Sequence, residues 1–371
     1  MTDYRLADPS QVPSPALLFY RDKIRHNIGR MLARAGSPDR LRPHCKTHKT
    51  RQIVRMLLEA GVTKHKCATI AEAEMLAQEK VPDILIAYPL VGPNTLRLVG
   101  LMMKYPGSRF RTLVDSHAGA EGLSRALSTA DLTAEIVLDL DVGQHRTGIA
   151  PGADAVALYG KIATMPGLKS GGLQAYDGHV HQGPLAEREA SVATEWTATL
   201  AMRDELRRRG HVVPRIVVGG TPSLPGWEHV AEAEIELSPG TCVLSDHGYG
   251  SRYADMSDFI VAAALLTRVV SKPTANRVTL DLGTKSVASD PPAGKRTRLL
   301  EIPDAEQVAH NEEHLVIETP SASKWAIGDV TYAWPTHICP TCALHQEALV
   351  VENGKIVDRW PIASRDRRLT I

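Results

Sequence analysis

The chain has 371 residues, which is long enough for two domains or for one large barrel with an appendage. Its 43 lysines and arginines balance 42 aspartates and glutamates, and the net charge of +1 argues against a nucleic-acid or membrane partner. No apolar run reaches the ~18 residues of a membrane span, and the polar N-terminus lacks the order of a signal peptide. The five cysteines are scattered, unlike a disulfide scaffold, so we expect a cytoplasmic protein.

Residues 15–252 alternate short apolar runs with stretches of helical periodicity, which is typical of repeated βα units. One expected helix, at residues 186–209, ends before Gly210. Near-continuous apolar strands suit a parallel sheet covered on both faces, so the pattern predicts an α/β fold with a (β/α)8 TIM-type barrel, and a doubly wound open sheet is the alternative. The eight expected strands lie at residues 41–45, 65–68, 84–88, 110–114, 134–140, 171–175, 215–218 and 235–237.

After about residue 253 the sequence changes to β-branched runs without long helices, for example at residues 259–270. This change predicts a separate, mainly β C-terminal domain of residues 253–371, which residues 1–14 would join. Its clearest element is a hairpin at residues 348–358, where an Asn-Gly pair fits a tight primed turn.

A cluster of basic residues surrounds the end of the first expected strand. The segment Arg42-Pro-His-Cys-Lys-Thr-His-Lys packs two histidines and two lysines into eight residues. Active sites of such barrels lie at the carboxyl ends of the strands, and neighbouring cations should lower the amine pKa of a lysine there. Lys46 is therefore a candidate for Schiff-base chemistry, although a solvated basic loop would have the same composition.

Polar residues and glycines also follow the later expected strands. Residues 141–148 contain two glycines that allow a tight loop, which would direct Arg146 inward. Glycines beside threonines after the seventh and eighth strands offer backbone N–H groups of the kind that bind phosphate. The candidates at these strand ends are Gln174, Tyr176, His179, His181, Gly219, Gly220, Thr221, Gly240 and Thr241.

His337 and Cys339 offer an imidazole and a thiol two residues apart in the C-terminal part. In an extended segment both side chains would point the same way and could bind one metal ion. Two protein ligands would leave positions open for water or substrate, as a catalytic site needs. Three alternatives are a redox pair of Cys339 with Cys342, a structural zinc held by all three residues, and simple burial of the thiols.

Taken together, these motifs resemble those of the fold-type III pyridoxal-phosphate enzymes of the D-threonine aldolase and D-serine dehydratase group, distant relatives of alanine racemase. The matching segments occur in family order and span nearly the whole chain. They are residues 42–49, 141–148, 172–176, 239–240, 281–285, 312–314 and 335–341.

The resemblance implies roles for the candidate residues. Lys46 would form the Schiff base with pyridoxal phosphate, and Arg146 would contact the ring oxygen of the cofactor. His337 and Cys339 would hold a divalent metal, for which the thiolate favours zinc over manganese or magnesium. The family assembles as a head-to-tail homodimer with shared active sites. The remaining residues expected around the cofactor are His44, Gln174, Tyr176, Gly219, Gly220, Thr221, Gly240 and Thr241.

The implied substrate is a β-hydroxy-D-amino acid. Removal of the hydroxyl proton leads to retro-aldol cleavage, and removal of the Cα proton leads to dehydration. Cys339 matches the dehydratases, whereas His179 and His181 lie near the activating histidine of the aldolases, whose own position falls on Gln182. We expect an aldolase of the D-threonine type, with a D-serine or other 3-hydroxy-D-amino-acid dehydratase as the alternative. A racemase or a non-catalytic pyridoxal-phosphate homeostasis protein would not need the metal pair.

Overall fold

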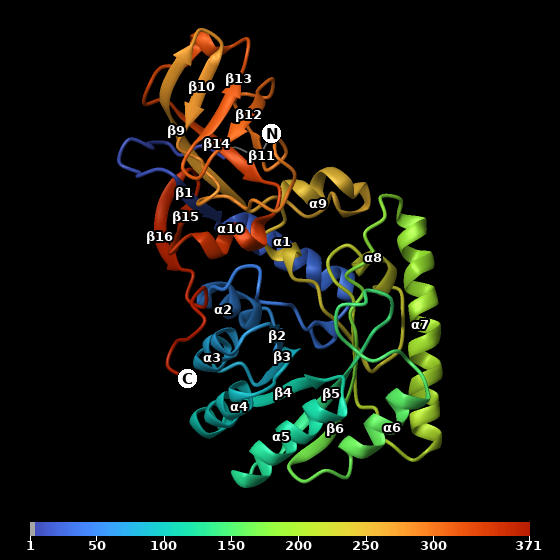
Figure 1. The fold of residues 1–371 in the computed structure, drawn as a ribbon. Coiled ribbons are helices and arrows are strands. Elements are labelled where there is room, and N and C mark those ends of the chain that lie inside the picture. Colours follow the sequence, from blue (N-terminus) through green and yellow to red (C-terminus); the bar gives the residue numbers. More distant parts are fainter. Residues whose placement is uncertain (1–3) are drawn as a thin grey trace. The chain divides into compact units, whose positions relative to one another are not determined.

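The computed structural model describes residues 4–371, which form two compact units (Figure 1). We call residues 32–46, 54–240 and 366–371 the barrel unit, and residues 4–31, 47–53 and 241–365 the β unit. Residues 1–3, which the sequence assigns to the C-terminal domain, lie outside the described residues. Within the described residues, no helix combines the length and the apolar character needed to cross a membrane.

The barrel unit is built on seven parallel strands that neighbour one another in chain order (Figure 1). The eighth expected strand, at residues 41–45, is present only as two isolated bridges, from Leu41 to Leu237 and from His44 to Lys66. Pro43 lies between them and has no N–H to donate, which limits the ladder there. The bridges still join the last strand to the first and close the barrel. The strands are β2 (Lys64–Cys67), β3 (Asp83–Pro89), β4 (Arg109–Val114), β5 (Ala134–Leu140), β6 (Leu168–Ala175), β7 (Ile216–Val218) and β8 (Ile235–Leu237).

Helices connect the strands, as the alternating pattern predicts. The expected helix at residues 186–209 is α7 (Leu185–Arg208), and Gly210 follows it with a φ of +82° that suits a glycine at a helix end. The hydroxyl of Thr69 accepts a hydrogen bond from the backbone N–H of Glu72 and caps α3. The other helices are α2 (Arg51–Glu59), α3 (Ile70–Gln78), α4 (Pro93–Lys104), α5 (His117–Thr129), α6 (Ala153–Ile162) and α8 (Leu224–Trp227), with a 3-10 turn at Pro38–Arg40.

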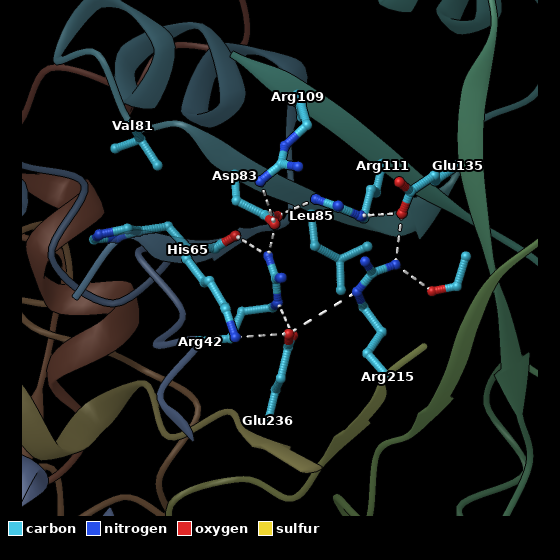
Figure 2. A network of polar contacts seen from close by, with 12 residues as sticks. Arg42, His65, Val81, Asp83, Leu85, Arg109, Arg111, Glu135, Arg215 and Glu236 are labelled. Carbon is cyan, nitrogen blue, oxygen red and sulfur yellow. Dashed lines mark hydrogen bonds and ion pairs between the residues drawn. The ribbon is translucent and has the colours of Figure 1, made fainter. Parts of the chain in front are cut away.

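A closed ring of six alternating charges fills the amino-terminal end of the barrel interior, and we call it the charge ring (Figure 2). Arg42 is fully buried and bonds Asp83 at 2.8 Å and Glu236 at 2.5 Å. Because each member comes from a different part of the barrel, the ring ties the closing segment to the strands on both sides. In order, its members are Arg42, Asp83, Arg111, Glu135, Arg215 and Glu236.

An apolar layer lies one step further along the strands. Leu85, Leu113, Val137 and Val217 pack together, and each is two residues beyond a member of the charge ring. Side chains two residues apart on a strand point to the same face, so these four continue the barrel interior. Residues beyond this layer belong to the carboxyl ends of the strands, where a site is expected.

The β unit contains a nine-stranded sheet, and the hairpin expected at residues 348–358 is confirmed. Asn353 and Gly354 have φ values of +49° and +72°, as a primed turn requires. The strands are β1 (Ala16–Tyr20), β9 (Ala263–Thr274), β10 (Arg277–Leu280), β11 (Thr297–Leu299), β12 (Glu306–His310), β13 (Leu315–Glu318), β14 (Val330–Pro335), β15 (Glu347–Glu352) and β16 (Lys355–Pro361). Its helical segments are α1 (Arg21–Ala35), whose last residues belong to the barrel unit, α9 (His247–Arg252), α10 (Ile338–Leu344) and the 3-10 turns Thr241–Val243, Ala254–Met256 and Ala322–Lys324.

Candidate active site

Lys46 ends the segment that closes the barrel. Its Nζ lies 5.7 Å from the centre of the Tyr176 ring, and its backbone N–H donates to Nδ1 of His44 at 3.3 Å. His44 is buried, and its own N–H donates to the carbonyl of Pro239. The closing segment therefore holds both residues at the carboxyl edge of the barrel. Arg42, which the sequence suggests as a neighbour of Lys46, instead directs its guanidinium into the charge ring.

Arg146 and Tyr176 come together, as the sequence predicts for the ends of the fifth and sixth strands. The guanidinium carbon of Arg146 lies 5.0 Å from the centre of the Tyr176 ring. The loop that carries Arg146 depends on Gly148, which has a φ of +101°. A Cβ at this position would lie 2.5 Å from the backbone nitrogen of Asp141, so no other residue fits without displacing the loop.

Gln174 is held by a buried carboxylate. Its Nε2 donates to Asp139 Oδ1 at 2.8 Å, and the Thr147 hydroxyl donates to Asp139 Oδ2 at 2.9 Å. Burial raises the pKa of Asp139, and these hydrogen bonds oppose the increase. Gln174 thus links β6 to the loop after β5, and it lies two residues before Tyr176 in the chain.

The glycine-rich turns after β7 and β8 provide backbone N–H groups near Tyr176. A Cβ on Gly220 would lie 3.3 Å from Tyr176 Cε2, and one on Gly219, whose φ is +74°, would lie 2.8 Å from Trp227. The N–H of Gly220 donates to the Ser223 hydroxyl at 3.0 Å. A Cβ on Gly220 would make a tight contact with the Tyr176 ring, so a glycine suits this turn and also suits the close approach of a phosphate group.

The turn after β8 lies against the turn after β7. The N–H of Gly240 donates to Oγ1 of Thr221 at 3.2 Å, so the structure brings these two candidates together. Thr241 belongs to the β unit, and its hydroxyl lies 3.5 Å from the Cys339 sulfur. The residues of the barrel unit thus offer pyridoxal phosphate an amine, an aromatic ring, a guanidinium and a glycine cradle, and they fit this cofactor.

His179 and His181, the candidate bases, have different surroundings. His179 Nε2 lies 3.1 Å from Glu195 Oε1 on α7, whereas His181 is exposed. Burial, and then the nearby charge of Asp177, raise the pKa of Glu195 to about 9. This close, buried neighbour distinguishes His179 from the exposed His181.

The sequence reasoning did not identify Asp177, which is fully buried one residue after Tyr176. Its Oδ2 accepts a hydrogen bond from Trp227 Nε1 at 2.6 Å, and burial raises its pKa. An aspartate directly after a candidate cofactor residue was the available signal, but its burial depends on Trp227, 50 residues away.

The sequence reasoning also did not identify Lys66 on β2. Its Nζ lies 5.4 Å from the centre of the Tyr176 ring, and the residue is only 3% exposed. Burial, and then the positive charge of Lys46, lower the pKa of Lys66 to about 7. The alternation along β2, which puts Lys64 and Lys66 on the same face, was the available signal.

The candidate metal ligands do not lie in an extended segment, so that premise was wrong. β14 ends at Pro335, and α10 begins at Ile338, so His337 is the cap residue and Cys339 lies in the first helical turn. The two side chains nevertheless share a hydrogen bond. A helix begins here because the buried carboxylate of Asp246 accepts the N–H of Ile338 at 3.1 Å.

The pair is strongly polar and has well-defined neighbours in the β unit. Nδ1 of His337 lies 2.5 Å from Asp290 Oδ2, and the Cys339 sulfur lies 3.1 Å from the Thr47 hydroxyl. Burial alone would lower the pKa of His337, but Cys339 and Asp290 raise it to about 9. Burial would likewise raise the pKa of Cys339, yet His337 lowers it overall. The two side chains are hydrogen-bonded to each other, and a divalent metal can replace this contact by binding both the nitrogen and the sulfur.

Within residues 4–371, no three histidine, cysteine, aspartate or glutamate side chains converge as a ready metal site. A nitrogen and a sulfur donor together suit zinc and leave coordination positions for other ligands. Cys342 is fully buried, and burial raises the pKa of its thiol well above the ordinary value, which makes it a poor third ligand. A cavity of about 900 Å³ opens beside His337 within the β unit and is bordered by Arg252, Lys295 and Arg298.

Comparison with known proteins identifies the family of the chain. Residues 20–245 match the alanine racemase N-terminal domain, and residues 262–351 match a serine dehydratase domain. A D-threonine aldolase from Arthrobacter sp is 30% identical over 364 residues, covering 96% of this chain and 94% of that protein.

Solved structures give the same result. The D-threonine aldolase from Filomicrobium marinum superposes with a TM-score of 0.88 at 27% identity and covers 96% of both chains. The D-threo-3-hydroxyaspartate dehydratase from Delftia sp. HT23 shares the fold, with a TM-score of 0.83 at 23% identity over 95% of this chain and 97% of that chain. The chain therefore belongs to the family of pyridoxal-phosphate-dependent aldolases and dehydratases in which a serine dehydratase domain follows an alanine racemase N-terminal domain.

Proposed function

We propose that this protein is a lyase that uses pyridoxal phosphate and a divalent metal to cleave the Cα–Cβ bond of β-hydroxy-D-amino acids, as in the conversion of D-threonine to glycine and acetaldehyde. The observation that carries the proposal is the presence of two kinds of chemistry in one chain. Lys46 lies beside Tyr176 in the barrel unit, and the His337–Cys339 pair lies in the β unit. Thr47, which contacts Cys339, follows Lys46 directly in the sequence.

We assign the cofactor to the barrel unit. When bound, pyridoxal phosphate supplies the electron sink that stabilises negative charge at Cα. Lys46 provides the amine for its covalent attachment, and Arg146 is assigned to the ring oxygen. Tyr176 flanks the ring, while the phosphate is assigned to the turns that contain Gly220 and Gly240. The assignment is supported by the tight contact, 3.3 Å, that a Cβ on Gly220 would make with the Tyr176 ring.

We assign the metal to His337 and Cys339. A metal held by these two residues would keep positions open for substrate and would act as a Lewis acid, which lowers the pKa of a bound hydroxyl group. The thiolate favours zinc, because manganese and magnesium prefer oxygen ligands. The three cationic side chains around the neighbouring cavity would favour a carboxylate in that region.

For the base we favour His179 over His181. Aldol cleavage requires a group that takes the proton of the β-hydroxyl, and the approach of His179 Nε2 to Glu195 at 3.1 Å favours His179 over the exposed His181 for this role. Dehydration is the second candidate reaction, and one residue favours it. Cys339 lies at the position where the aldolases of this family usually have an aspartate. The overall similarity to D-threonine aldolases supports cleavage.

Product analysis tests the proposal. We expect purified enzyme with pyridoxal phosphate and zinc to convert D-threonine into glycine and acetaldehyde, and to leave L-threonine unchanged. A 2-oxo acid and ammonia from D-threonine or D-serine would identify a dehydratase instead. Lys46→Ala and His337→Ala should each abolish turnover, whereas His229→Ala, at an exposed histidine in the loop after α8, should not. Absence of both sets of products would contradict the proposed function.

We also propose that the protein acts as a homodimer with shared active sites, in line with the family resemblance. Light scattering of the purified protein should give twice the mass of one chain. A monomer that retains full activity would contradict this proposal.

A further inference from the structure

Lys66 has no part in the function proposed above, yet it shares the Tyr176 ring with Lys46. The two amine nitrogens lie 5.4 Å and 5.7 Å from the centre of that ring. We propose that Lys66 is a cofactor-binding residue, whose ammonium group balances the negative charge of pyridoxal phosphate inside the barrel. The inference rests on the proposed function, because it adds one residue to the cofactor site named there.

The position of Lys66 is unusual for a lysine. The residue lies in β2, opposite Leu85 of β3, and its other neighbour is the bridged residue His44. Leu85 belongs to the apolar layer above the charge ring. Lysine is rarely buried to this degree unless its charge is paired, so the amine needs an anionic partner near Tyr176.

Two buried carboxylates lie near Lys66, and both act on it electrostatically. Asp139 already accepts hydrogen bonds from Gln174 and Thr147. Asp177 already accepts one from Trp227. Burial raises the pKa of both carboxyl groups, which shows that the surroundings do not fully compensate their charge. Among the described residues, Asp177 Oδ1 has no hydrogen-bond partner, and no ion pair joins either carboxylate to the amine of Lys66.

The two other cationic residues near Tyr176, Lys46 and Arg146, do not take the role proposed for Lys66. Lys46 is used for covalent attachment of the cofactor, so its amine no longer serves as a separate ammonium group. Arg146 contacts Tyr176 from an exposed loop. Lys66 is then the one remaining buried cation beside Tyr176 within the part of the chain that the structure describes. A cofactor that carries a phosphate and a phenolic oxygen would supply the negative charge that balances the ammonium group of Lys66 inside the barrel.

Other titratable groups around β2 face elsewhere. Arg42 is neutralised by the charge ring, and Nδ1 of His44 accepts the N–H of Lys46. His65 places Nε2 against the carbonyl of Val62, on the opposite face of β2. Glu72 on α3 accepts the N–H of Ala68. The electrostatics of Lys66 are therefore set by Lys46, Asp139, Asp177 and whatever anion binds beside Tyr176.

The inference predicts a coupling between cofactor binding and proton uptake. Without ligand, the pKa of Lys66 is about 7, so above neutral pH the amine is mostly uncharged. An anion beside the amine favours the charged form and raises this pKa. Binding should therefore transfer a proton from solvent to Nζ, and affinity should fall as the pH rises above about 7.

Pyridoxine 5′-phosphate is a suitable probe because it has the ring and phosphate of the cofactor but no aldehyde, so Lys46 cannot attach it. Since Lys46 then keeps its own ammonium group, the titrations are repeated in a Lys46→Ala background, which matches the attached state in this respect. We would measure its dissociation constant by fluorescence titration and its proton uptake by calorimetry in two buffers, between pH 6 and 9. The variants are Lys66→Met, which removes the charge, and Lys66→Arg, which keeps it at every pH. Lys64→Met is the matched control, since Lys64 lies on the same face of β2 but bonds Glu236 of the charge ring.

We expect Lys66→Met to weaken binding at pH 7 at least tenfold and to abolish the excess proton uptake. Lys66→Arg should bind tightly without loss of affinity from pH 7 to 9, and Lys64→Met should match the wild type. Equal affinity and proton uptake in wild type and Lys66→Met would overturn the inference. If the wild type bound neither this probe nor pyridoxal phosphate, the proposed function itself would fail. Lys66→Arg keeps the test valid if Lys66→Met does not fold.

Discussion

Replacement of Arg42 by methionine should destabilise the barrel unit more than any exposed arginine replacement. Arg42 has no exposed side-chain surface and bonds Asp83 at 2.8 Å and Glu236 at 2.5 Å. Its loss leaves Glu236 without its closest counter-charge and Asp83 with Arg111 as its remaining close partner, and removal of one partner of a buried ion pair costs about 3–5 kcal/mol. For a unit of this size, about 2–4 °C per kcal/mol gives a decrease in melting temperature of about 6–20 °C.

Arg109→Met is the matched control for this prediction. Arg109 approaches the same carboxylate, Asp83, but at 3.9 Å and with 72% of its side chain exposed. Exposed ion pairs contribute about 0–1 kcal/mol, so its melting temperature should change by no more than about 4 °C. Hydrogen–deuterium exchange of peptides that cover β2 and β8 would locate the loss in the barrel unit. Equal effects of the two variants would refute the reasoning from burial.

Three further predictions concern acid stability, the metal and the Arg146 loop. Burial alone would raise the pKa values of Asp83 and Glu236, but arginines lower them below their ordinary values of 3.8 and 4.5. The stabilisation from these two carboxylates is complete above about pH 5.5, so the urea midpoint should decrease as the pH falls through about 4.5; a flat profile from there to pH 3 would contradict this prediction. Chelation with dipicolinate should abolish turnover of D-threonine while the visible absorbance of the bound cofactor persists, and added zinc should restore activity. Gly148→Ala should weaken cofactor binding about tenfold by displacing the loop, whereas Gly122→Ala, with no atom within 4 Å of its new Cβ, should bind normally.

The elements that follow from local sequence were predictable. Strands such as β5 and the hairpin around Asn353 are encoded in a few consecutive residues, because alternation and turn chemistry act over short distances. Lys46, Arg146 and Tyr176 were predictable for a related reason, since parallel strands place their carboxyl ends at one edge.

The features that depend on distant partners were not predictable. His337 and Asp290 are 47 residues apart, and their contact depends on how the β unit folds. Lys66 reads as an ordinary strand lysine until closure of the barrel buries it. The segment around His337 was misread because its helix depends on the distant carboxylate of Asp246 rather than on a local capping side chain.

The charge ring also limits how such barrels can be recombined. Its three arginines and three carboxylates come from six separate stretches of chain. A strand taken from a barrel with an apolar residue at this position would therefore leave the neighbouring charges of the ring without partners. Chimeras should therefore tolerate exchange of the loops at the carboxyl edge more readily than exchange of single strands. Replacement of the charge ring by apolar residues would require all six positions to be changed together.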